Sequence, residues 1–130
     1  MLDTSPLTAA VERFADRLRA APQSRLQQGA AEVALDLARE LSVRAQRLEA
    51  AAAGAGDGAG AAPARRMPDA GIFVVGDQVA VAGQDLAEAL HAAWTEAGAA
   101  ATPANVTTAP SEVLDEAVRL VEQAEVRAMR

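Results

Sequence analysis

Apolar residues recur every three or four positions near the start of the chain, and charged residues fill the opposite side. The stripe comprises Leu7, Val11, Phe14, Leu18 and Ala21. This spacing is typical of an amphipathic α-helix. Ser5 and Pro6 suit the N-cap and the first helical position, and Pro22 ends the pattern. The pattern therefore predicts a first helix from about residue 6 to residue 21.

A second amphipathic segment follows closely. Ser24 and Gln27 have the spacing of a capping box. The apolar stripe comprises Leu26, Ala30, Val33, Leu37, Leu41 and Leu48, widened by Ala34, Ala38 and Ala45. Leu35 and Val43 fall off the stripe, and either lie on the surface or form a second contact face. The short connection between the two segments favours an antiparallel helical hairpin over residues 1–49.

Residues 50–66 contain four glycines and no large apolar side chain. Such a segment has nothing to bury, so we interpret it as a flexible low-complexity linker. It separates the helical hairpin from a second unit at residues 67–130. We expect this unit to dock with residues 1–49 as a single domain.

The second unit begins with a pattern typical of strands. Apolar residues dominate positions 72–75 and 78–81, on either side of Gly76 and Asp77. Glycine at the first loop position is typical of a type II′ hairpin turn. The spacing therefore predicts a β-hairpin over residues 71–83. One face would carry Ile72, Val74, Val79 and Val81, and the other Phe73, Val75, Gln78 and Ala80.

Both faces of this hairpin are largely apolar, and an isolated two-stranded hairpin is marginal in water. The protein's own helices, or a second copy or partner, must therefore cover it. The candidate interaction surface comprises Ile72, Val74, Val79, Val81 and Trp94. The single tryptophan also fits the core, beside Leu90.

Two further helices complete the predicted order. One begins near Asp85 and ends at Gly98, and the other begins after Ser111. The sequence thus predicts a mainly α, α+β fold: two helices in a hairpin, a linker, a β-hairpin and two helices.

Composition narrows the possible partners. Apolar residues make up 51% of the chain, yet only Phe14, Phe73 and Trp94 are aromatic. All twelve basic residues are arginine, which we attribute to a high-GC bacterial genome. The net charge is −6, and residues 67–130 carry ten acids against three arginines. This charge argues against binding to nucleic acid or to an anionic membrane.

The sequence carries no set of residues typical of an enzyme. There is no cysteine, and His91 is the only histidine, with no cluster of other ligands beside it. Residues 54–59 match the letters of a dinucleotide fingerprint, but they follow a helix rather than a strand. We expect no catalytic residues, no metal and no cofactor.

The sequence shows neither a signal peptide nor a transmembrane stretch, so we expect a cytoplasmic location. Three hypotheses for function remain. The first is a small adaptor that binds another protein. The second is a structural homodimer built through the 71–83 hairpin. The third is a small regulatory domain that binds a ligand between the predicted sheet and Trp94.

Overall fold

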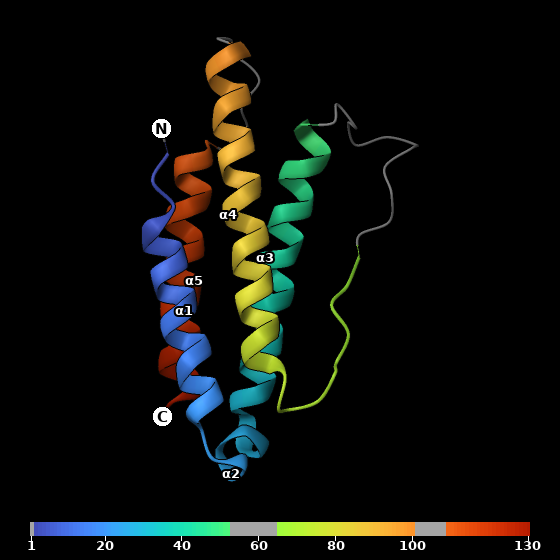
Figure 1. Ribbon diagram of the computed structural model, residues 1–130, viewed down its shortest axis with the longest axis vertical. Coiled ribbons are helices and arrows are strands. Elements are labelled where there is room, and N and C mark those ends of the chain that lie inside the picture. Colours follow the sequence, from blue (N-terminus) through green and yellow to red (C-terminus); the bar gives the residue numbers. More distant parts are fainter. Residues whose placement is uncertain (1, 53–64, 101–108) are drawn as a thin grey trace.

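The part of the chain that the structure describes forms a four-helix bundle. The computed structural model describes residues 2–52, 65–100 and 109–130, and 83% of these residues are helical (Figure 1). The long helices are α1 (Ser5–Ala20), α3 (Ala31–Ala52), α4 (Val75–Ala100) and α5 (Pro110–Ala128). Two short elements, α2 (Gln23–Arg25) and η1 (Leu26–Ala30), turn the chain between α1 and α3.

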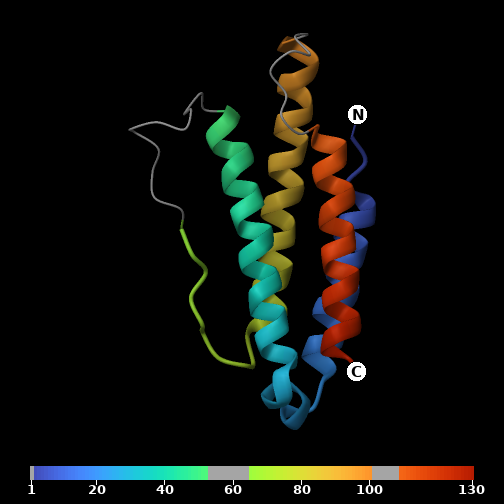
Figure 2. The same ribbon diagram turned by 180° about the vertical axis from the view of Figure 1, so that it is seen from behind.

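The helices form two layers. Helices α1 and α4 lie in front in Figure 1, and α3 and α5 come to the front when the bundle is turned around in Figure 2. Helix α1 runs down the bundle, α3 and α4 both run up, and α5 runs down. The main contacts pair α3 with α4, α1 with α4, α3 with α5, and α1 with α5. Helices α1 and α3 are therefore antiparallel but lie on a diagonal of the bundle.

A sharp bend at Gly29 redirects the chain into α3. Gly29 has a φ of 128°, which lies in the left-handed region that favours glycine. Leu26 and Ala30, on either side of the bend, are buried. The bend therefore changes the direction of the chain without exposing these two apolar side chains.

Because α3 and α4 are parallel, the chain must return along the bundle between them. Residues 65–74 make the described part of this return, beside α3 (Figures 1 and 2). The side-chain amide of Gln46 donates to the Arg65 carbonyl and accepts from the Arg65 N–H, each at 2.7 Å. Arg39 donates to the Met67 carbonyl at 2.9 Å, and Gln78 to the Pro68 carbonyl at 2.8 Å. Side chains of α3 and α4 thus provide hydrogen-bond partners for backbone groups of Arg65, Met67 and Pro68 in this segment.

The predicted β-hairpin is wrong, and with it the α+β class. Residues 72–74 form a turn and α4 begins at Val75, so nearly all of the predicted 71–83 hairpin is turn or helix. No strand occurs in the described parts of the chain. Gly98, the predicted helix stop, lies inside α4. The predicted linker at 50–66 falls mostly on residues 53–64, outside the described ranges.

A helical stripe runs through the supposed strands and explains the error. The residues Val75, Val79, Ala82, Leu86 and Leu90 recur at spacings of four, three, four and four, and all are buried. This stripe packs α4 into the core, and the packing overrides the strand preference of valine. Gly76 and Gly83 are tolerated in the helix because α1 passes close to both of them.

The core is made of leucine, valine and alanine around one aromatic ring. Its largest fully buried side chains are Phe14, Leu7, Leu41, Leu86, Leu90, Val79 and Val121. Many alanines are buried beside them, including Ala15, Ala34, Ala38 and Ala117. Small side chains let the helix backbones approach one another. Leu35, which falls off the main stripe, is buried as well.

Ion pairs link helices at the edges of the bundle. Arg13 and Arg17 of α1 approach Glu125 of α5, a largely buried carboxylate, at 3.3 and 3.4 Å. Arg44 of α3 binds Glu116 of α5 through two guanidinium nitrogens. These contacts fix α5 against α1 and α3.

The Arg44–Glu116 pair makes stability depend on pH. Hydrogen bonding to Arg44 lowers the pKa of Glu116 below its ordinary value of 4.5. A carboxylate with a depressed pKa stabilises the fold above its unfolded pKa, and this stabilisation is lost as the pH falls through the folded pKa. We expect Glu116→Gln to lower the unfolding temperature at pH 7, and the deficit to shrink as the pH falls below about 4.5.

Thermal unfolding of both proteins from pH 7 to pH 3, followed by circular dichroism, tests this expectation. Glu122→Gln is the matched control, because Glu122 is exposed on the same helix and makes no ion pair with a described residue. A deficit in Glu116→Gln that stays constant down to pH 3 would contradict an ionic origin.

Candidate interaction surface on α4

The structure separates the residues of the predicted surface. Val79 is 0% exposed and belongs to the core, whereas Val81 is 54% exposed on the outer face of α4. Ile72 and Val74 are half-buried in the turn before α4. Trp94 is 40% exposed, thirteen residues beyond Val81 or about 20 Å along the helix. Val81 and Trp94 therefore do not form one patch.

Sequence reasoning missed Phe73, which is the most exposed large apolar side chain among the described residues at 73%. Phe73 sits in the turn directly before α4 and lies outside the helical stripe that begins at Val75. Had the sequence pattern from Val75 been recognised as helical, Phe73 would have been predicted as an exposed residue outside the helix. Among the residues whose exposure the structure describes, four large apolar side chains are exposed, and three of them, Phe73, Val81 and Trp94, lie on α4 or directly before it.

Acidic residues surround Val81. Asp77, Asp85 and Glu88 are all exposed on α4, and no arginine or lysine occurs from Val75 to Ala100. Arg19 of α1 donates to Asp77 at 2.7 Å and to Asp16 at 3.2 Å, and so compensates part of this charge. Asp85 and Glu88 make no ion pair with any described residue.

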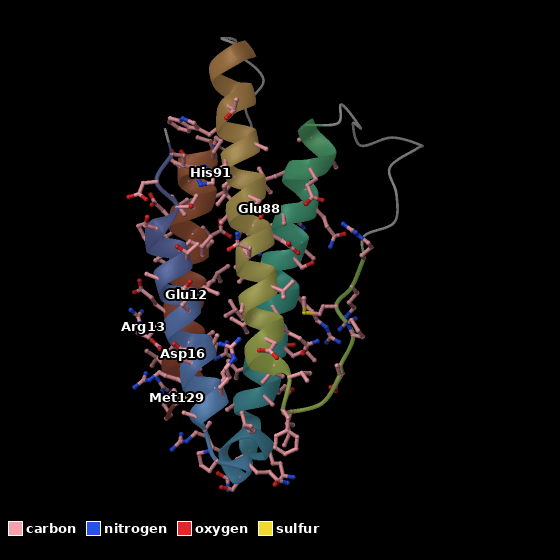
Figure 3. All side chains as sticks on the ribbon, viewed as in Figure 1. Glu12, Arg13, Asp16, Glu88, His91 and Met129 are labelled. Carbon is pink, nitrogen blue, oxygen red and sulfur yellow. The ribbon has the colours of Figure 1, made fainter. Side chains whose placement is uncertain are left out.

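Helix α1 extends the acidic surface. Figure 3 views the bundle from the side of α1 and α4, and labels Glu12 and Asp16 on α1 and Glu88 on α4. Glu12 is exposed and, like Glu88, has no ionic partner in the described ranges. We call the set Glu12, Asp16, Asp77, Val81, Asp85 and Glu88 the acidic face.

The end of α4 projects beyond the other helices (Figure 1). Trp94 lies eleven residues after Gly83, or about three helical turns, and so shares the side of α4 that faces α1. The start of α1 lies at the level of His91 on α4, because Oγ1 of Thr4 lies 3.0 Å from Nε2 of His91. Trp94 therefore stands past the start of α1 and remains partly exposed.

His91 makes a hydrogen bond between two parts of the bundle. Its ring nitrogen bonds the Thr4 hydroxyl and thereby joins α4 to the residues before α1. In the described ranges, no three histidine, cysteine or acidic side chains gather as potential metal ligands. The hypothesis of a pocket between a sheet and Trp94 is wrong, because the described residues contain no sheet.

None of the described helices is both long and apolar enough to cross a bilayer. Protein-family models, curated proteins and solved structures were compared with the chain, and none matches it.

Proposed function

We propose that this protein is a cytoplasmic protein-binding module whose acidic face receives a basic amphipathic helix of a partner. The observation that carries the proposal is Val81, a valine exposed on α4 beside Asp85 and Glu88, whose carboxylates make no ion pair with any described residue. An amphipathic helix docks through apolar side chains spaced three and four residues apart. Arginine or lysine beside those positions would meet Asp85 and Glu88.

Charge favours a different protein over a second copy as the partner. In a twofold symmetric dimer the same patch occurs on both sides of the interface. Asp85 and Glu88 would then face the same carboxylates of the other copy, and apposed like charges are unfavourable. The homodimer hypothesis also required a β-hairpin, which the described residues do not contain.

The chain provides a matched pair of valines for the test. Val81 on α4 is 54% exposed, and Val126 on α5 is 56% exposed. Arginine at either position adds the same charge and removes the same side chain. We expect Val81→Arg to weaken partner binding by at least about tenfold, because it removes an apolar contact and repels a basic helix. Val126→Arg should bind like the unchanged protein.

The probe is a fluorescently labelled synthetic amphipathic helical peptide with a leucine stripe flanked by arginines, titrated while the fluorescence anisotropy of the peptide is recorded. A peptide with glutamates in place of the arginines is the control. Binding of the arginine peptide that Val81→Arg weakens and Val126→Arg leaves intact supports the proposal. Equal binding of both peptides, or equal loss in both variants, would overturn it.

A second experiment, carbodiimide crosslinking, identifies natural partners and takes advantage of the absence of lysine from this chain. Carbodiimide joins carboxylates to amines, and this chain has no lysine side chain to form internal links. Crosslinks from Asp85 or Glu88 to lysines of a captured protein therefore report contacts between proteins. Crosslinks confined to other acids, such as Glu122, would place the interface elsewhere.

A further inference from the structure

A hollow opens at the end of the bundle where α5 finishes. Figures 1 and 2 show the end of α5 and the α2 turn at the same end of the molecule. The hollow has a volume of about 350 Å³, within the range of small-molecule sites. It is lined by Arg25 and the junction of η1 with α3 on one side, and by Arg127, Ala128 and Arg130 on the other.

Three arginines line this hollow. Arg25 donates from Nη1 to a main-chain oxygen of Arg130, the last residue of the sequence, at 2.8 Å, which positions its guanidinium at the rim. Arg127 and Arg130 are exposed on the opposite side. None of the three forms an ion pair with a described Asp or Glu side chain, and no Asp or Glu lines the hollow, so the three guanidinium groups face at most the single main-chain carboxylate of Arg130. Three arginines with at most one carboxylate beside them are unusual in a protein with a net charge of −6.

Like charges held together repel one another, so this cluster lowers stability unless an anion binds. Guanidinium groups bind phosphoryl oxygens through paired, charge-assisted hydrogen bonds. A phosphoryl group carries close to two negative charges and three strong hydrogen-bond acceptors. It can therefore bind several arginines at once, whereas a single carboxylate offers less charge and fewer acceptors. Gln28 adds a polar group, and Ala30, Val33 and Ala128 provide apolar surface for a carbon skeleton.

We propose that this hollow binds a small phosphorylated metabolite, with Arg25, Arg127 and Arg130 holding the phosphoryl group. Gly29 contributes by the backbone bend that sets η1 against α3, and a side chain added there would meet no atom within 4 Å. The site lies on α2, η1, the start of α3 and the end of α5, and none of the residues of the acidic face lines it. The two proposals are therefore independent.

Calorimetric titration with ribose 5-phosphate tests the site. Ribose is the control without phosphate, and citrate at equal ionic strength is the carboxylate control. We expect one ribose 5-phosphate to bind per chain, no binding of ribose, and citrate to bind at least about tenfold more weakly. Citrate binding as tightly as ribose 5-phosphate, or no binding of either anion, would overturn the proposal.

The arginines are tested by the double variant Arg127→Gln and Arg130→Gln. Each lost charge-assisted contact should weaken ribose 5-phosphate binding about tenfold, or about a hundredfold together. Arg119→Gln is the control, since Arg119 is exposed on the same helix and does not line the hollow. Unchanged affinity in the double variant, or equal losses in both proteins, would exclude this site.

Thermal unfolding separates a binding role of these arginines from a structural one. A binding role predicts that the double variant unfolds at the same or a higher temperature without ligand, because repulsion is relieved. It also predicts that ribose 5-phosphate raises the unfolding temperature of the unchanged protein only. A double variant that unfolds earlier without ligand and is still stabilised by ribose 5-phosphate would show that the arginines serve the fold.

Discussion

Replacing Phe14 by alanine is expected to lower the free energy of unfolding by about 3–5 kcal/mol. Phe14 is 0% exposed and is the only fully buried aromatic side chain of the described residues. The alanine would leave a cavity where α1 meets the rest of the core. A domain of this size is stable by only about 5–15 kcal/mol, so the variant should lose a large share of its stability. Urea denaturation followed by circular dichroism measures the loss.

The other phenylalanine provides the control. Phe73 is 73% exposed, so Phe73→Ala should change the free energy of unfolding by less than about 0.5 kcal/mol. Equal losses for the two substitutions would show that Phe14 is not at the centre of the core. A large loss for Phe73→Ala alone would place Phe73 in a stabilising contact that the bundle does not contain.

The second large effect is expected at Gly83, where α1 and α4 approach closely. A Cβ at this position would lie 2.6 and 2.7 Å from the two methyl carbons of Val11. Alanine favours a helix over glycine by about 1 kcal/mol. The clash outweighs this gain, because the β-branched side chain of Val11 is stiff and the helices must separate. We expect Gly83→Ala to lower the free energy of unfolding by about 1–3 kcal/mol.

A double-mutant cycle isolates the contact. Val11→Ala removes the methyl carbons that the new Cβ would meet, so the double variant should be more stable than the sum of the single effects predicts. Gly76→Ala is the graded control, because its Cβ would lie 3.1 Å from the Ala15 carbonyl oxygen and from Cγ of Arg19. Additive effects in the cycle, or Gly83→Ala more stable than the unchanged protein, would contradict this close approach.

The sequence predicts helices where their apolar stripes are unambiguous. The stripes that begin at Leu7 and Leu26 lie on α1 and on η1 with α3, and the helix predicted to begin after Ser111 corresponds to α5. The start of α4 escaped prediction because β-branched residues flank Gly76 and Asp77, a local pattern that strands share. The helical alternative depends on contacts with Val11 and Ala15, which lie about sixty to seventy positions earlier in the chain.

Surface features were harder to predict than the helices. Val81 was singled out because of a strand alternation, and it is exposed for a different reason, its place on the outer side of α4. The strand pattern placed Val79 on the candidate interaction surface and Phe73 on the opposite face. In the helical structure Val79 belongs to the core, and Phe73 is exposed before α4. The arginine hollow had no local signal, because Arg25 and Arg127 lie about a hundred positions apart in the chain and meet only through the bundle topology.

The diagonal arrangement of the helices has a consequence for how the bundle assembles. Helices α1 and α3 come from the first half of the chain and α4 and α5 from the second, and the main helix contacts all join one half to the other. Neither pair buries its apolar stripes by folding on itself, so the two halves are related as the subunits of an obligate heterodimer are. The segment between α3 and α4 then acts as a tether that raises the effective concentration of one half for the other. Proteolysis between the halves would make folding a bimolecular reaction, and stability would then depend on protein concentration.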